Sequence, residues 1–350
     1  MSEPPYPPTG PQGPSGPVDP YGQPGQYPPG TVPPGQYQQG QYPAYPPAPP
    51  AGYSVPQWQH QPPAGYDPLI SQTVGEWWQK SINLVRQAWR PLVTLQAIGM
   101  AATIATQAPV AIYTELTAAN RGAADASDLG GLMASLGLTS LGSLLSVVVT
   151  ALVTVGSIYV LMAVVAGLRP DLGPALHGAA RRAFPLIGWQ FLAGVIILAG
   201  VCACVLPAFY FAAVFTVLPA VVAFERGGAI GRCFTLFHRD LGAAAGRMAC
   251  IVGFAIAAGL AGLGISAVVR LVVVGSQLGG TADTGAIVLS GLISTTIAAV
   301  ISGGLAVLTA PLTLTAYADL RARTEPLATP VLLTQLGMPV PQAPPMPPMV

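Results

Sequence analysis

The sequence predicts an all-α, polytopic membrane bundle with six transmembrane helices, and three observations support this fold class. First, 52% of the 350 residues are hydrophobic and 8% are charged, whereas soluble domains carry about 25% charged residues. Second, six apolar segments are each long enough, at roughly 20 residues, to cross a hydrocarbon layer of about 30 Å as a helix. Third, the basic residues sort to one side of these segments.

Residues 1–70 form a Pro/Gly/Gln/Tyr-rich tail that we expect to be disordered. Residues 1–66 hold 21 of the 38 prolines and 8 of the 12 tyrosines, contain no Lys or Arg, and repeat GQY at positions 25, 35 and 40. Such a composition buries too little apolar area to offset the loss of chain entropy, and it favours polyproline II. The tail is either a solvated spacer or a low-affinity docking segment for an unknown protein partner. Without an apolar signal sequence, we expect it to be cytoplasmic.

The membrane domain is predicted to cover residues 71–325, followed by a Pro/Met-rich disordered tail at 326–350. We place the spans at about 92–113, 144–168, 186–206, 207–224, 248–268 and 286–310. The third and fourth spans run together, and Pro207 predicts a tight hairpin between them because proline cannot continue a helix. The prolines inside spans, Pro109, Pro219 and Pro311, mark either helix breaks around a cavity or kinks near helix ends, and their positions favour kinks.

The distribution of basic residues predicts that both termini are cytoplasmic. With this topology, Arg121 and Arg270 lie outside and twelve basic residues lie inside: Lys80, Arg86, Arg90, Arg169, Arg181, Arg182, Arg226, Arg232, Arg239, Arg247, Arg321 and Arg323. This is the positive-inside pattern. The excess of Arg over Lys, with abundant Ala and Gly, suggests a bacterial source. The predicted location is therefore a bacterial cytoplasmic (plasma) membrane.

Three basic amphipathic helices are predicted on the cytoplasmic side, each just before a span. Their apolar stripes are Val74, Trp78, Ile82, Val85 and Trp89 in the first, Leu172, Leu176, Ala180 and Ala183 in the second, and Ile230, Phe234, Phe237 and Leu241 in the third. Such helices suit the headgroup layer, although a buried core helix is the alternative for the first. Their arginines act as topology determinants or additionally collect anionic headgroups of the lipid bilayer.

The last span carries small residues at every fourth position: Ser290, Ser294, Ala298, Ser302, Ala306 and Ala310. This stripe predicts close helix packing, within one bundle or across a homo-oligomer. Beyond it, Pro311 is expected to bend the helix at the hydrocarbon edge. Tyr317 is then expected at the interface, with Asp319, Arg321 and Arg323 in water and headgroups. Asp319 and Arg323, four residues apart, can pair on the helix surface.

Two stretches, VLPAVVAFERGGAIGRCFTLFHRD at 217–240 and AYADLRAR at 316–323, resemble the bacterial family named for the membrane domain of glycerophosphoryl diester phosphodiesterases. The matching residues are Pro219, Glu225, Arg232, Tyr317, Asp319, Leu320, Arg321 and Arg323. Gly231, Cys233, Phe234 and Ala318 depart from the family pattern. The resemblance implies a six-span membrane module. Because only 25 residues follow Glu325, it does not imply the soluble catalytic domain found in some members.

No catalytic constellation is visible, so we expect no enzyme activity, no cofactor and no metal site. The sequence lacks HExxH, GxSxG and Walker motifs, and the six span cores contain no Asp, Glu, Lys, Arg or His. Ion-coupled carriers usually need an ionisable group within the membrane. The net charge of +1 offers no footprint for nucleic acid.

Two functions remain open. The first is a non-enzymatic scaffold or accessory module that organises lipids or protein partners. The alternative is a carrier or flippase for a small or lipid-like substrate that lacks a titratable coupling residue in the membrane. A polar-lined cavity that reaches the middle of the bilayer would favour the carrier.

Overall fold

The computed structural model describes residues 67–120, 129–276 and 284–340, and it confirms the all-α fold class, since these residues contain helices and no strand. The helices are α1 (Val74–Asn120), α2 (Leu129–Val165), α3 (Leu172–Ala203), α4 (Val205–Phe215), α5 (Leu218–Phe224), α6 (Ala229–Arg239), α7 (Leu241–Ser276), α8 (Thr284–Ala322) and α9 (Thr329–Gln335). The disorder predicted for residues 1–66 and 341–350 lies outside the described residues.

Six segments of the described chain are long and apolar enough to cross a membrane, as predicted. They are Val74–Thr117, Met133–Val165, Leu172–Ala203, Val205–Phe224, Leu241–Val269 and Thr284–Ala322. Each contains most or all of one of the six spans expected from the sequence. The chain is therefore a multi-pass membrane protein. Glu115 follows the predicted span of 92–113 and lies within α1.

The fourth span is broken, which corrects the expectation of a continuous helix with a kink at Pro219. Helix α4 ends at Phe215 and α5 starts at Leu218, so that Pro219 lies in the first turn of a new helix. A proline ring clashes with the carbonyl four residues earlier in a continuing helix but fits a first turn. Pro109 and Pro311, by contrast, lie inside the continuous helices α1 and α8.

The hairpin predicted between the third and fourth spans is present and turns at Cys204. This residue is extended, with φ −178° and ψ 153°, and Pro207 follows in the first turn of α4. Gly200 allows the two helices to approach closely. A Cβ atom on Gly200 would lie 3.0 Å from the backbone nitrogen of Ala208, closer than side chains normally pack.

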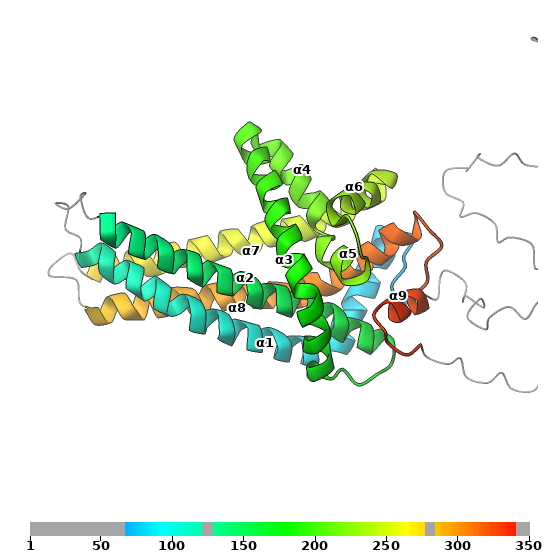
Figure 1. The fold of residues 1–350 in the computed structure, drawn as a ribbon, viewed down its shortest axis with the longest axis horizontal. Helices are drawn as coiled ribbons and strands as arrows, with labels where there is room; N and C mark the ends of the chain where they lie inside the picture. The colour runs from blue at the N-terminus through cyan, green and yellow to red at the C-terminus, as the bar shows by residue number, and fades with distance from the viewer. Residues whose placement is uncertain (1–66, 121–128, 277–283, 341–350) are drawn as a thin grey trace, which may run out of the picture. The chain divides into compact units, whose positions relative to one another are not determined.

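Helix α8 occupies the centre of the described bundle. It packs along α1 and α7, while α1 also packs along α2 (Figure 1). Helix α3 packs along α2 and α4, and α3 and α4 lean away from the other long helices in this view. Large apolar side chains are exposed on α3 and α7, among them Phe184, Phe191, Leu198, Leu260, Leu263 and Leu271. Such surfaces are expected where helices face lipid.

Two stretches that the sequence placed in the tails belong to the core. Leu69 and Ile70 are buried before α1, and Leu332 and Leu333 of α9 are buried near the other end of the chain. The Asp67 carboxylate joins these stretches, because it accepts hydrogen bonds from the backbone of Leu69 and from both the backbone and hydroxyl of Thr329. The membrane domain therefore extends further in both directions than the predicted limits of 71 and 325.

The three predicted amphipathic helices are present, but the buried face of the first differs from the predicted apolar stripe. The first and second are the N-terminal parts of α1 and α3, continuous with the spans, and only the third is a separate helix, α6. In the part of α1 before Pro91 the buried residues are Trp77, Ser81, Leu84 and Ala88, whereas Val74 and Trp89 of the predicted stripe are exposed. The predicted stripe therefore does not form the protein core, and the protein packs against a neighbouring face of the same helix.

We predict that Gly200→Val destabilises the protein by about 1 to 3 kcal/mol, because the added methyl groups force α3 and α4 apart. The control is Gly194→Val on the same helix, where a Cβ meets no atom within 4 Å. Replacing this exposed glycine is expected to be neutral or slightly stabilising. Denaturation in detergent micelles, monitored by circular dichroism, compares the two variants. Equal stability of both would show that the hairpin is not closely packed at Gly200.

Candidate functional site

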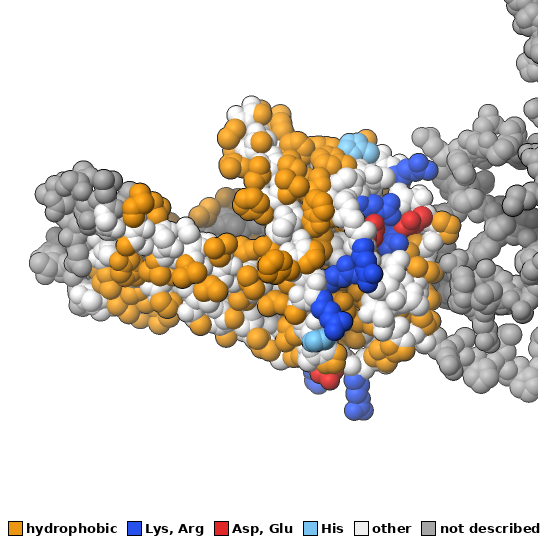
Figure 2. Space-filling view, in the orientation of Figure 1, with side chains coloured by type: hydrophobic (Ala, Val, Ile, Leu, Met, Phe, Trp, Pro, Cys, Tyr) orange, Lys and Arg blue, Asp and Glu red, His pale blue; other side chains and the backbone are white. Residues whose placement is uncertain are grey.

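Charged side chains gather at one end of the six-span unit, where α3 and α7 begin and α8 ends. We call this the basic end. Figure 2 shows its Lys and Arg side chains beside a hydrophobic surface that covers the long helices. The last turns of α8 are buried here. Tyr317 and Asp319 are fully buried, and Arg321 is 8% exposed. The expectation that these residues reach the interface and water is wrong, because α1, α5, α6 and α7 surround this end of α8.

The most buried charges at the basic end form an ion pair. Arg247 of α7 lies 2.8 Å from the Asp319 carboxylate of α8, with side chains that are 1% and 0% exposed. The backbone N–H of Ser71 and the Arg323 guanidinium also donate to Asp319, at 3.2 and 3.1 Å. This confirms the predicted Asp319–Arg323 pair. A buried carboxylate needs such partners, since an unpaired charge in a protein interior costs several kcal/mol.

Arg323 extends this cluster to the junction between α6 and α7. Its guanidinium lies 2.5 Å from the Asp240 carboxylate and donates to the carbonyl of Gln72 at 2.8 Å. Burial alone would raise the pKa of Asp240. Its hydrogen bond from Ala243 and its pair with Arg323 outweigh burial, so that the pKa lies below the usual value. Asp240 is thus held ionised at neutral pH.

A second cluster centres on Glu225, which directly follows α5. One oxygen of Glu225 accepts a hydrogen bond from the Tyr317 hydroxyl at 2.8 Å, and the other lies 2.8 Å from Nε of Arg232. Arg232 also contacts Glu325 at 2.9 Å. Arg321 pairs with Glu325 and donates to the Tyr317 hydroxyl and to Gln335 of α9. In the two clusters together, most charged side chains near the end of α8 are paired with a residue of opposite charge.

Six of the eight residues of the family resemblance therefore belong to these two clusters. Glu225, Arg232, Tyr317 and Arg321 lie in the second cluster. Asp319 and Arg323 lie in the first, Leu320 is buried beside them, and Pro219 starts α5. The sequence interpretation missed the roles of Asp240, Arg247 and Glu325. Arg247 offered one signal, since it is the single charge in the apolar run LGAAAGRMAC. An arginine in such a run needs a buried partner.

Cys233 of α6 is fully buried near Glu225, whereas Cys202, Cys204 and Cys250 are exposed, so that burial of all four cysteines as small apolar residues is not observed. Burial and the charge of Glu225 raise the pKa of the Cys233 thiol to about 12. The thiol therefore stays protonated and unreactive at neutral pH. Within the described residues, no group of three His, Cys, Asp or Glu side chains could hold a metal ion.

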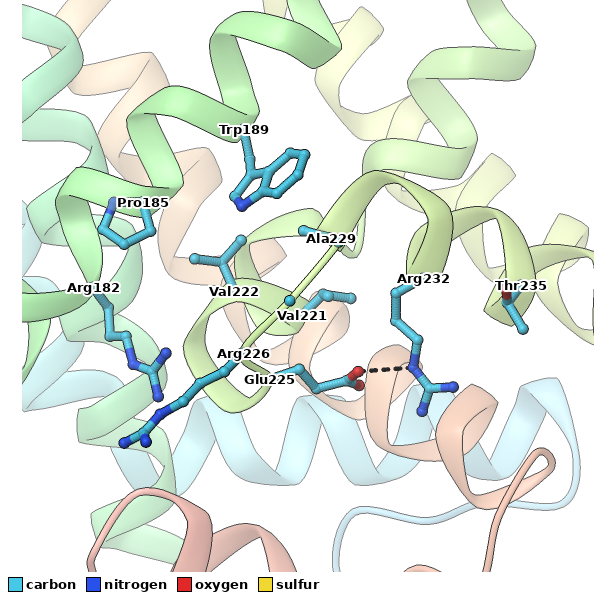
Figure 3. Close-up of a pocket in the computed structure, with 12 residues that line it drawn as sticks. Arg182, Pro185, Trp189, Val221, Val222, Glu225, Arg226, Ala229, Arg232 and Thr235 are labelled. Carbon is cyan, nitrogen blue, oxygen red and sulfur yellow. Dashed lines mark ion pairs between the residues drawn. The ribbon is translucent and has the colours of Figure 1, made fainter.

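A pocket of about 550 Å³ opens at the basic end between α3, α5 and α6 (Figure 3). We call it the arginine pocket. Arg182, Pro185 and Trp189 line it from α3, and Arg226 and Arg232 line it from the loop after α5 and from α6. Gly227, with φ 153°, forms the turn that carries the chain from Arg226 towards α6, a conformation that favours glycine.

A second cavity, of about 490 Å³, lies between α1, α2 and α8 within the spans, and we call it the transmembrane groove. Its polar lining residues are Gln96, Thr103, Gln107, Glu115, Ser146, Thr150, Thr154, Ser294, Thr295 and Ser302. Gln96 donates to Ser157 at 3.1 Å, and Gln107 donates to the carbonyl of Gly142 at 3.0 Å. At the end furthest from the basic end, Ser290 donates to Glu115 at 3.1 Å.

The small-residue stripe of the last span lines this groove over much of its length. Ser294, Ala298, Ser302 and Ala306 all belong to its wall. Two glycines next to stripe residues mark close approaches of α8 to α1. A Cβ atom on Gly303 would lie 2.7 Å from Sδ of Met100, and one on Gly291 would lie 3.2 Å from Ile112. These four stripe residues thus border a cavity, whereas the sequence interpretation assigned them to helix packing. Ser290 is buried, and Ala310 is half-buried near the basic end.

Comparison of the chain with protein-family models, with curated proteins and with solved structures finds no match. The family resemblance therefore rests on the matching residues alone.

We predict that Arg247→Met destabilises the protein by about 3 to 5 kcal/mol, because it leaves Asp319 buried without its closest cation. Arg239→Met removes an exposed arginine eight residues earlier and is expected to change stability by less than about 0.5 kcal/mol. Denaturation midpoints in mixed micelles measure both.

The double variant Arg247→Met with Asp319→Asn removes both charges of this pair and is expected to recover part of the loss, because Asn can still accept the Ser71 hydrogen bond. If Arg247→Met were as stable as Arg239→Met, the buried ion pair would not be a main determinant of the fold.

Proposed function

We propose that this protein is a carrier or flippase that moves a small amphipathic, lipid-like substrate through the transmembrane groove. The observation that carries the proposal is the polar lining of a cavity that reaches the middle of the spans. Thr103 and Ala298 line it, and each lies near the centre of the span predicted from the sequence, 92–113 and 286–310 respectively. The predicted scaffold requires no polar path through the membrane, so the groove favours the alternative.

The extent of the polar lining supports this proposal. Ten of the nineteen lining residues are polar, although exposing polar groups to hydrocarbon is unfavourable. Along α1 the lining runs from Gln96 to Glu115, which spans about 28 Å at the rise of an α-helix, close to the thickness of the hydrocarbon layer. Polar residues in this arrangement are typical of substrate paths.

The lining also indicates the chemistry of the substrate. Its hydroxyl and amide groups suit a polar group that hydrogen-bonds, and Met100, Val149 and Val153 suit an apolar part. Each glutamine uses one described hydrogen bond, and an amide side chain can form more. A volume of about 490 Å³ lies in the range of about 300 to 1,000 Å³ of small-molecule sites. The groove is partly open, so acyl chains of a bound lipid can remain in the bilayer.

The experiment is lipid scrambling by the purified full-length protein in liposomes. Fluorescent phosphatidylcholine, phosphatidylethanolamine and phosphatidylglycerol are each incorporated, and quenching by dithionite measures the fraction that reaches the outer leaflet. We predict that at least one of these lipids crosses faster than in protein-free liposomes.

Ser302→Leu, which fills the groove, is expected to slow this movement about tenfold, as a loss of about 1.4 kcal/mol would. The matched control is Gly304→Leu, two residues along α8, where a Cβ meets no atom within 4 Å and the residue does not line the groove. Its rate is expected to match that of the unmodified protein. Absence of movement for all three lipids, or equal rates for the two variants, would contradict the proposal.

A further inference from the structure

We propose that the arginine pocket binds the phosphate of an anionic phospholipid headgroup at the basic end of the membrane domain. This site is separate from the transmembrane groove, and the inference does not rest on the proposed carrier function. It rests on the charge balance of the pocket, on the partners of its charged residues, and on its position beside the hydrophobic surface.

The charge balance of the pocket is positive. Arg182, Arg226 and Arg232 line it, and Glu225 is the one carboxylate among its lining residues. Both oxygens of Glu225 are already engaged, one by the Tyr317 hydroxyl and the other by Arg232. Glu225 and Glu325 together balance Arg232 and Arg321, with which they pair. The charges of Arg182 and Arg226 remain uncompensated.

Arg182 and Arg226 have no ion pair or hydrogen bond with any residue that the structure describes. Arg182 is half-buried against the pocket wall, and Arg226 is exposed at the loop. In the view of Figure 3 the Arg182 and Arg226 side chains extend towards each other on one side, and the Glu225 and Arg232 pair lies on the other side of Arg226. Two guanidinium groups that share a pocket repel each other, and an anion between them would relieve this repulsion. Guanidinium groups bind phosphate oxygens through paired N–H donors.

The position of the pocket favours a lipid as the source of this phosphate. Pro185 and Trp189 line it one turn apart on α3, and Trp is enriched where a span meets the headgroup layer. On the same helix, Phe184 is 86% exposed and Phe191 is 75% exposed, so that the adjoining surface suits acyl chains. A headgroup phosphate can therefore lie between the arginines while its chains follow α3 into the bilayer.

The test measures lipid binding by the purified full-length protein in a non-ionic detergent. Native mass spectrometry counts bound phosphatidylglycerol, phosphatidic acid and phosphatidylcholine at about 0.15 M salt, an ionic strength that screens diffuse attraction beyond about 8 Å. Soluble glycerol phosphate is added in a separate arm. The variant Arg182→Gln with Arg226→Gln is compared with Arg181→Gln with Arg239→Gln. The control pair removes the same charge, from α3 and from the end of α6, but does not line the pocket.

We expect phosphatidylglycerol and phosphatidic acid to bind better than phosphatidylcholine. The pocket variant should lose affinity at least about tenfold for the two anionic lipids, the effect of losing a charge-assisted hydrogen bond. The control variant should keep its affinity within about twofold, as expected for exposed charges. If glycerol phosphate binds as tightly as the lipids and with the same dependence on Arg182 and Arg226, the phosphate site is supported but its ligand is soluble.

Two results would overturn the proposal. Equal losses in the pocket and control variants would show only diffuse attraction by surface charge. Absence of preferential binding of anionic lipids and of glycerol phosphate to the unmodified protein would show that the pocket is not a phosphate site. Failure of lipid scrambling in liposomes would affect neither conclusion, because that experiment reports on the groove.

Discussion

The buried ion pair between Arg247 and Asp319 is the constraint on which the basic end of this protein depends. It joins the start of α7 to the end of α8, and the Ser71 N–H and Arg323 bring the segment before α1 and the α6–α7 junction to the same carboxylate. Removing two charges from water is costly, and only complete pairing makes such an arrangement stable. The orientation of several helices is thereby linked to a single carboxylate.

This constraint separates the charged residues into two functional groups. Asp319, Arg247, Arg321 and Glu225 are held by several partners each and serve the fold. Arg182 and Arg226 have no such partner among the described residues, and they line an accessible pocket. The sequence alone does not separate the paired residues from the pocket arginines, because both groups are charged and lie at the basic end. The difference lies in burial and pairing, which depend on tertiary contacts.

The architecture was largely predictable from the sequence, because the lipid environment imposes strong rules on composition. Uncharged runs as long as 286–310 predict spans, and Pro207 indicated the hairpin that turns at Cys204. The break before Pro219 and the burial of residues 317–321 were not predicted. A short charged run after a span is usually exposed, and here partners from distant parts of the chain, Ser71, Asp240, Arg247 and Glu325, bury it.

The groove shows a second limit of sequence patterns. The spacing of four from Ser290 to Ala310 predicts a smooth helix face, and such a face suits both close packing and the wall of a cavity. Which of the two occurs depends on the residues that directly follow Ser290 and Ser302 in the sequence. Gly291 and Gly303 bring α8 against α1. The adjacent face then borders a space whose opposite walls carry Gln96, Gln107 and Thr150. Of the stripe residues in the wall, only Ser294 and Ser302 carry a polar group. The glutamines of α1 and the hydroxyl groups of α1 and α2 make the groove suitable for a polar group. They belong to segments that the sequence predicts only as apolar spans.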